Sequence, residues 1–179
     1  DVYYALDNTK GRIFAYDFQG NMLYAFGGHG YKAGLFMNPS AIEDIGDSLL
    51  VTDQKLGTIT QFTLTDYGKM INDGLAEYKK GNYDKSANIW RKVLKHNGNY
   101  DQAYIGIGRA LLREKNYKEA MDYFELKLDA KNYSKAFKLY REVWFEENIG
   151  TILIIIAILI LLGFGVGFVK KARREVEKG

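Results

Sequence analysis

Few side chains in this sequence are suited to catalysis or metal binding. The chain has two histidines, His29 and His96, and no cysteine. Without cysteine it has no thiol nucleophile, no disulfide and no cysteine-based metal site. The two histidines lie in segments with different sequence patterns, so we do not expect them to share a metal ion.

Two aspartates recur at equivalent places in a repeated pattern. Asp7 and Asp53 each follow a run of alternating residues and precede a turn that contains glycine. Carboxylates placed in this way could bind calcium at the mouth of a β-propeller. Because both copies of the pattern carry the aspartate, we expect instead that each side chain closes the turn that follows it.

The cluster Gly27-Gly28-His29-Gly30 shares only its glycines with a phosphate-binding loop. It lacks the Lys-Ser/Thr pair and does not open a helix, so it is predicted to be a linker between strands. The sequence also has no Ser/His/Asp set, carboxylate pair or cofactor fingerprint above background. We therefore expect no enzyme activity and no cofactor. A net charge of +3 is too small to indicate nucleic-acid binding.

The elements that must position these residues begin with strands. Residues 1–66 alternate between polar and apolar side chains and contain glycine-bearing turns, which predicts strands at 2–6, 12–18 and 22–26. The pattern repeats after 46 residues, a period typical of propeller blades. The repeated pairs are Asp7 and Asp53, Gly11 and Gly57, Ile13 and Ile59, and Tyr16 and Phe62.

Three short motifs resemble the NHL-repeat propeller family. They are the glycine-rich linker from Phe26 to Pro39, the strand end Val51-Thr52-Asp53, and the strand Arg12-Ile13-Phe14-Ala15-Tyr16. The resemblance implies that residues 1–66 are the C-terminal part of an NHL-like β-propeller. Three strands of one blade and the first three of the next are present, and the other blades and the closing strand are expected from a preceding portion.

Residues 67–147 change to the 3.6-residue period of helices and repeat after 34 residues. This helix–turn–helix pattern resembles the tetratricopeptide repeat (TPR). Small residues would let the helices approach closely while aromatic rings fill the neighbouring grooves. The predicted packing residues are Gly74, Trp90, Gly108, Ala120 and Phe124.

A partial third copy of this pattern predicts a capping helix. Asn132-Tyr133-Ser134 fits a glycosylation sequon, but we expect Ser134 to be the N-cap of that helix. The helix should run through Trp144 and Phe145, which suit a membrane interface. About three residues, 148–150, would separate it from the next element.

Residues 148–170 are predicted to form a transmembrane helix, because 149–169 carry no charge and would span roughly 31 Å. Residues 171–179 would form a basic cytoplasmic tail. The basic residues Lys170, Lys171, Arg173 and Arg174 follow the span, which predicts a cytoplasmic C-terminus near anionic lipid and an extracytoplasmic region before residue 148. Gly163, Gly165 and Gly167 would allow another membrane helix to approach.

The predicted fold class is α+β with several domains: a partial propeller, a TPR array and one membrane helix. Because residue 1 is Asp and no signal peptide precedes this exported region, we expect a fragment of a longer chain. The lack of disulfides suits a bacterial cell surface. Further membrane segments could follow Gly179.

The order of propeller, TPR repeats and span resembles a family of Gram-positive bacterial membrane proteins associated with carbohydrate ABC-type transporters. The resemblance implies an accessory or scaffolding subunit whose partners are transporter permease subunits and the lipid bilayer. An extracellular ligand sensor is the alternative, and a propeller lactonase or lyase is a third possibility. The residues themselves indicate an anchored binding module, because neither repeat fold specifies a reaction.

Overall fold

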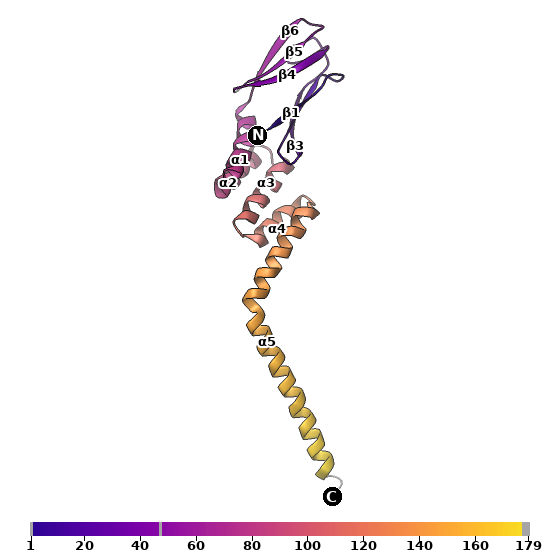
Figure 1. Cartoon of the computed structure of the whole chain (residues 1–179), viewed down its shortest axis with the longest axis vertical. Helices are drawn as coiled ribbons and strands as arrows, with labels where there is room; N and C mark the ends of the chain where they lie inside the picture. Colours follow the sequence, from indigo (N-terminus) through magenta and orange to yellow (C-terminus); the bar gives the residue numbers. More distant parts are fainter. Residues whose placement is uncertain (1, 47, 177–179) are drawn as a thin grey trace. The chain divides into compact units, whose positions relative to one another are not determined.

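The computed structural model describes residues 2–46 and 48–176, without the side chains of residues 168, 171, 172 and 174–176. The chain divides into two compact units, Asp1–Ala136 and Phe137–Gly179. The first unit contains two small antiparallel sheets followed by helical hairpins, and the second contains most of one long apolar helix (Figure 1). The predicted α+β class is confirmed. The described residues do not form a closed propeller.

Each sheet is a meander of three strands in sequence order. The first sheet consists of β1 (Tyr3–Asp7), β2 (Arg12–Tyr16) and β3 (Met22–Gly27), and the second of β4 (Pro39–Ile45), β5 (Ser48–Asp53) and β6 (Thr58–Thr63). The first three strands match those predicted at 2–6, 12–18 and 22–26 to within a few residues. The alternation of side chains is thus a true signal of extended structure here.

The 46-residue repeat is also a repeat of backbone geometry. Asp7 pairs with Arg12 across the turn from β1 to β2, and Asp53 pairs with Thr58 across the turn from β5 to β6. Gly11 and Gly57 have φ angles of 64° and 65° at equivalent places in these turns. Glycine adopts this left-handed conformation without a steric penalty, so both copies form the same turn.

The core between the sheets contains Ile13, Phe36, Leu49 and Val51. The Phe26 and Phe62 rings pack on it edge to face, with centroids 5.0 Å apart. Burying each large side chain contributes roughly 1.5–3 kcal/mol. Ile59, the counterpart of Ile13, is 69% exposed, since no further sheet covers β6 within the described residues.

The segment from Gly28 to Asn38 links the two sheets and seats Phe36 in their core. Phe36 N–H donates to the Gly28 carbonyl at 2.8 Å, and Gly30 N–H donates to the Phe36 carbonyl at 2.9 Å. The segment leads into β4 rather than into a helix. The prediction of a linker in place of a phosphate loop is therefore confirmed.

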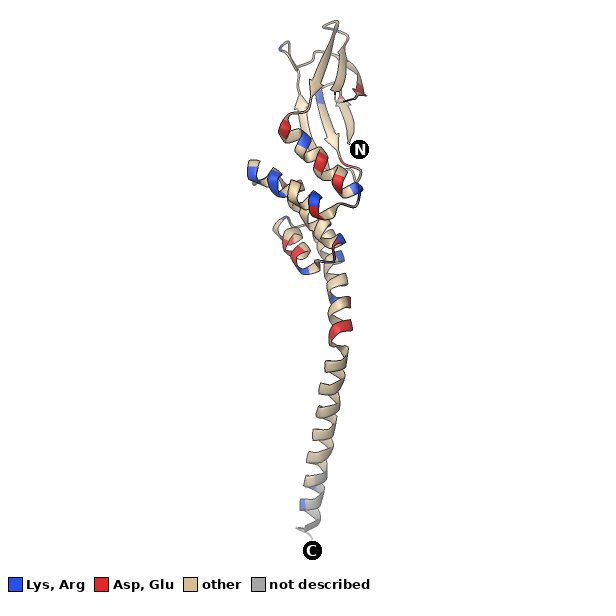
Figure 2. Cartoon of the chain, turned by 90° about the vertical axis from the view of Figure 1, so that its left-hand side faces the viewer, with Lys and Arg blue, Asp and Glu red and all other residues tan. Residues whose placement is uncertain are grey.

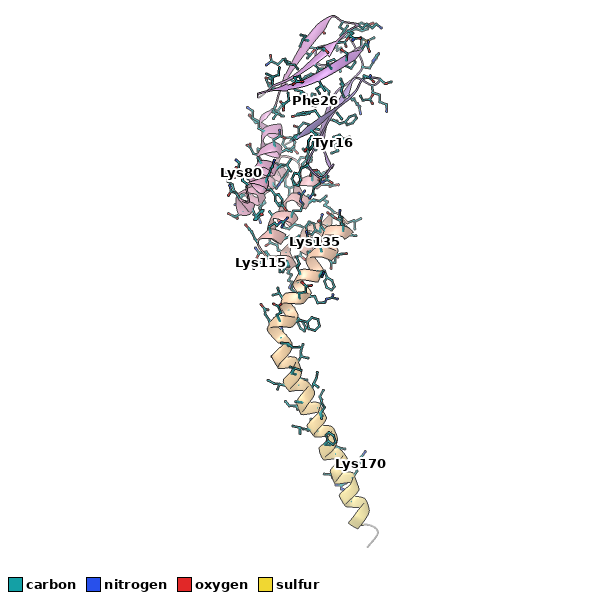
Figure 3. All side chains as sticks on the ribbon, in the orientation of Figure 1. Tyr16, Phe26, Lys80, Lys115, Lys135 and Lys170 are labelled. Atoms are coloured by element: carbon teal, nitrogen blue, oxygen red, sulfur yellow. The ribbon has the colours of Figure 1, made fainter. Side chains whose placement is uncertain are left out.

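Two helical hairpins follow the sheets. The helices are α1 (Asp66–Lys79), α2 (Tyr83–His96), α3 (Asp101–Arg113) and α4 (Tyr117–Leu126). α1 begins where Thr65 Oγ1 accepts a hydrogen bond from Gly68 N–H at 3.1 Å. After α1 and α3, Gly81 and Lys115 adopt positive φ angles of 86° and 65°. Lys115 is labelled in Figure 3. Gly81 and Lys115 occupy the same repeat position, so the backbone hydrogen bonds of the two helices end in the same way.

The last described helix, α5, spans Ala130–Val176 and begins earlier than predicted. Asp129 caps it, because Asp129 Oδ1 accepts a hydrogen bond from Asn132 N–H at 3.1 Å. Ser134 lies inside the helix, so its predicted role as N-cap is wrong. Asp caps at least as well as Ser and stands before the first turn, so the helix starts at the earlier residue.

α5 runs through residues 148–150 without a break, whereas the sequence placed a separating segment there. Asn148 Nδ2 donates to the Trp144 carbonyl at 2.8 Å, one turn earlier. This side-chain hydrogen bond is compatible with a continuous helix. Figure 2 shows a long stretch of α5 free of Lys, Arg, Asp and Glu.

Candidate functional site

Trp90 of α2 fills the gap between α1 and α3. Its side chain is 1% exposed. A Cβ at Gly74 would lie 2.8 Å from Trp90 Cε2, and one at Gly106 would lie 2.5 Å from Trp90 Nε1. The Trp90 ring therefore fits only because α1 and α3 have glycine, which has no side chain, at positions 74 and 106. The repeat pattern identified Gly74 but missed Gly106, which has no glycine counterpart in the preceding repeat.

The second hairpin is packed in the same manner. Phe124 and Ala120 of α4 are fully buried. A Cβ at Gly108 would lie 2.6 Å from Phe124 Cε1. In the first hairpin Ser86, the counterpart of Ala120, donates its hydroxyl to the Gly74 carbonyl at 2.7 Å. Four of the five predicted packing residues thus form two aromatic–glycine contacts, Trp90 with Gly74 and Phe124 with Gly108, and the fifth, Ala120, is fully buried.

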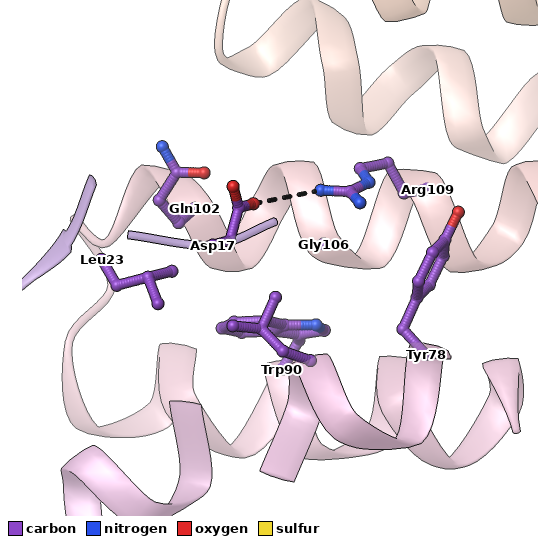
Figure 4. A pocket seen from close by; sticks show the side chains of 8 residues that line it. Asp17, Leu23, Tyr78, Trp90, Gln102, Gly106 and Arg109 are labelled. Atoms are coloured by element: carbon purple, nitrogen blue, oxygen red, sulfur yellow. Dashed lines mark ion pairs between the residues drawn. The ribbon is translucent and has the colours of Figure 1, made fainter. Parts of the chain in front are cut away.

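α1 and α3 share one face that packs on the first sheet, and we call it the inner face. Leu75 of α1 and Arg109 of α3 occupy equivalent repeat positions on it, and both are buried. Arg109 Nη1 lies 3.5 Å from Asp17 Oδ2, which belongs to the turn between β2 and β3 (Figure 4). Sequence reasoning missed both charges. For the burial of Arg109 a signal was available, because its counterpart Leu75 marks this repeat position as one that faces apolar surroundings.

A second charged cluster holds the turn between α1 and α2. The Glu77 carboxylate accepts hydrogen bonds from Asn82 Nδ2 at 2.8 Å and Lys80 Nζ at 2.9 Å. Lys85 Nζ lies 3.2 Å away. These three donors lower the pKa of Glu77 to about 2 from its ordinary 4.5. The folded state therefore favours the charged form of the Glu77 carboxylate.

We expect the stability of the first unit to fall less steeply with decreasing pH in Glu77→Gln than in the native chain, over the range from pH 4.5 to about 2. Because the folded pKa is depressed, the stabilisation by Glu77 is complete above pH 4.5 and is lost as the pH falls towards 2. Thermal melts across this range should show native and variant chains converging at low pH. Glu125→Gln, which alters an exposed carboxylate on α4, is the control. An unchanged gap between native and Glu77→Gln at pH 2 would contradict the assignment.

The first unit also contains an open cleft between the two sheets and α1. Its volume is about 1040 Å³, at the upper end of typical ligand pockets. On one side Tyr24 OH donates to Asn72 Oδ1 at 3.2 Å, and its oxygen is 3.3 Å from Tyr4 OH. Since Tyr24 uses its proton for Asn72, Tyr4 must be the donor to Tyr24. Tyr4 lines the cleft, and as a donor to Tyr24 its hydroxyl oxygen can still accept a hydrogen bond.

Aromatic rings and a few charges complete the cleft. Burial of the hydroxyl raises the pKa of Tyr24, so the phenol stays neutral. Phe26, Phe62 and Tyr67 also line the cleft, and its charged lining residues are Asp44, Asp73 and Lys69. With two carboxylates against one ammonium group, this lining disfavours an anionic ligand. Sequence patterns could not identify the cleft, because its residues come from both sheets and a helix.

The aspartates predicted to close turns do so. Asp53 accepts hydrogen bonds from four backbone N–H groups, those of Met37, Asn38, Lys55 and Leu56. Although burial would raise the pKa of Asp53, these bonds lower it overall. Asp7 accepts one such bond, from Lys10 N–H at 2.9 Å.

Metal-ligating side chains do not gather elsewhere in the described part of the chain. No group of three or more His, Asp or Glu residues there is arranged to hold a metal ion. His29 and His96 are both exposed. His96 packs against Tyr67 with ring centroids 6.1 Å apart, so its neighbour is an aromatic ring.

The apolar part of α5 is long and apolar enough to span a membrane, with a mean hydropathy of 3.0 in its most apolar window and none of that window buried. Gly163, Gly165 and Gly167 are exposed, and an added Cβ at each would meet nothing within 4 Å. Lys170 and Arg173 are also exposed, whereas the side chains of Lys171 and Arg174 lie outside the described residues.

Comparison with known proteins bears on the helical hairpins. No curated protein matches the chain. Residues 72–135 match the family model described as tetratricopeptide repeat. The matched residues run from within α1 to the first turns of α5 and include both aromatic–glycine contacts.

Proposed function

We propose that this chain is a membrane-anchored, non-catalytic module for protein–protein interaction. The proposal rests on two features of one chain. They are the TPR-type helical hairpins and an apolar helix whose most apolar stretch is not buried. TPR arrays offer extended surfaces for binding other proteins. A span holds such a surface beside its membrane partners.

More specifically, the chain would be an accessory subunit of a carbohydrate ABC-type transport complex, with permease subunits as partners. The support for this is the resemblance of the domain order described above. The two sheets would be the C-terminal part of an NHL-like propeller. The repeated register favours this interpretation. The outer edges of β1 and β6 pair with no further strand within the described residues, and exposed edges call for further strands.

The proposed topology places residues 1–147 outside the membrane and the basic tail in the cytoplasm. Lys170 and Arg173 lie directly after the uncharged run, where positive residues mark the cytoplasmic side. Protease added to intact cells should remove the sheets and hairpins and leave a C-terminal epitope intact. Protection of the N-terminal region would reverse the orientation.

Substitutions at the glycines of α5 test the proposed partnership. Gly163 and Gly167 lie one helical turn apart, so a neighbouring helix could approach this face closely. The double replacement Gly163→Ile, Gly167→Ile should lower recovery of the permease in mild detergent without changing the melting of the first unit. Leu159→Ile, which keeps a side chain at an exposed position of the same helix, is the control.

An extracellular ligand sensor is the second candidate, and the open cleft of about 1040 Å³ favours it. Its rings and neutral hydroxyl groups suit a small neutral ligand with polar groups of its own. If the native chain and the glycine variants all behave as isolated monomers in native membranes, the accessory-subunit proposal fails and the sensor takes its place.

A further inference from the structure

Asp17 is a buried carboxylate that shapes the turn between β2 and β3. It is 2% exposed. Its Oδ1 accepts hydrogen bonds from Gln19 N–H at 2.8 Å and Asn21 N–H at 2.9 Å, and its Oδ2 accepts one from Asn21 Nδ2 at 2.8 Å. Asp17 N–H also donates to the Asn21 carbonyl at 3.0 Å. The hydrogen bonds that shape the turn therefore lie within residues 17–21.

The turn presents one acidic and one aromatic side chain to the inner face of the TPR helices. The Asp17 carboxylate faces Arg109 at 3.5 Å. The Arg109 guanidinium carbon lies 5.1 Å from the Phe18 ring centroid and 4.9 Å from that of Tyr78. Figure 4 shows Asp17, Arg109 and Tyr78 around the inner face. One cation of the helices thus meets a carboxylate and two rings at once.

Strand β3 extends this contact along the helices. Tyr100 OH donates to the Leu23 carbonyl at 2.8 Å, and Tyr24 OH donates to Asn72 Oδ1 at 3.2 Å. The cavity left between turn and helices is about 10 Å³, roughly the room for one water molecule. The inner face is therefore filled.

We propose that the turn 17–21 is an intramolecular ligand of the inner face, and that this face accepts an acidic–aromatic turn of a partner protein only when its own turn is displaced. The inference rests on the proposed interaction function. While the turn is seated, partners dock on other surfaces of the helices. A segment of the same chain competes at a high effective concentration, so it excludes a free segment of similar affinity.

The test uses the full chain in nanodiscs and a labelled cyclic peptide with the sequence of residues 12–27. Asp17→Asn in the chain removes the charge that faces Arg109 and keeps an oxygen for the backbone bonds of the turn. This chain should bind the peptide saturably, as measured by fluorescence anisotropy. The native chain should bind it at least about tenfold more weakly.

Matched controls separate the contact from general effects of charge. Asp7→Asn removes a carboxylate that closes its own turn by accepting a hydrogen bond from Lys10 N–H, and this chain should behave like the native one. A peptide carrying Asp17→Ala should bind neither chain. Phe18→Ala is a second way to loosen the turn, and folding should tolerate it because Phe18 is 41% exposed.

Two results would overturn the proposal. One is equal binding of the peptide to the native and Asp17→Asn chains. The other is absence of binding to both the Asp17→Asn and the Phe18→Ala chains while circular dichroism shows folded helices. Neither result depends on a permease, so failure here is distinct from failure of the proposed function.

Discussion

Replacing Trp90 with alanine is expected to lower the free energy of unfolding of the first unit by about 3–5 kcal/mol. The indole is 1% exposed and meets the backbone of two neighbouring helices at Gly74 and Gly106. Its removal leaves a cavity that helices held by several other contacts cannot fully close. Chemical denaturation of the full chain in detergent, followed by near-ultraviolet circular dichroism, measures the loss.

Trp144→Ala is the matched control for this change. Trp144 lies on α5 and is 43% exposed, so its truncation should alter the unfolding of the first unit little. Equal midpoints for native and Trp90→Ala chains would show that Trp90 does not hold the hairpins together. The packing derived from the 34-residue repeat would then be incorrect.

Arg109→Met is expected to cost a similar amount, about 3–5 kcal/mol, because it leaves a buried charge without its partner. Asp17 is 2% exposed, and Arg109 Nη1 is the cation beside it. Methionine would fill much of the space but cannot compensate the carboxylate. The same denaturation measurement applies.

The double variant Asp17→Asn, Arg109→Met should recover much of this loss, since neither position of the pair then carries a buried charge. Arg91→Met removes an arginine from an exposed pair with Glu119 and should cost at most about 1 kcal/mol. A loss in Arg109→Met no larger than that in Arg91→Met would contradict the role assigned to the buried pair.

The sequence by itself determined the local elements and their repeats. Alternation of side chains predicted the strands, because one face of each sheet must be buried. The 46-residue and 34-residue periods predicted repeated turns and hairpins, and Gly11 with Gly57 and Gly74 with Gly108 show why. Such positions tolerate few residue types, so the same residues return in each copy. The uncharged run in α5 needed only its length and composition to be identified.

Only the tertiary structure decided how the sheets meet the helices. Asp17 and Arg109 are far apart in the sequence, and each alone looks like a surface charge. The cleft beside Tyr4, Tyr24 and Asn72 likewise joins three separate elements. Contacts between elements of different period leave no repeating pattern in the chain, so periodicity cannot reveal them. The start of α5 was decided by a competition between Asp129 and Ser134, which depends on the geometry of the preceding turn.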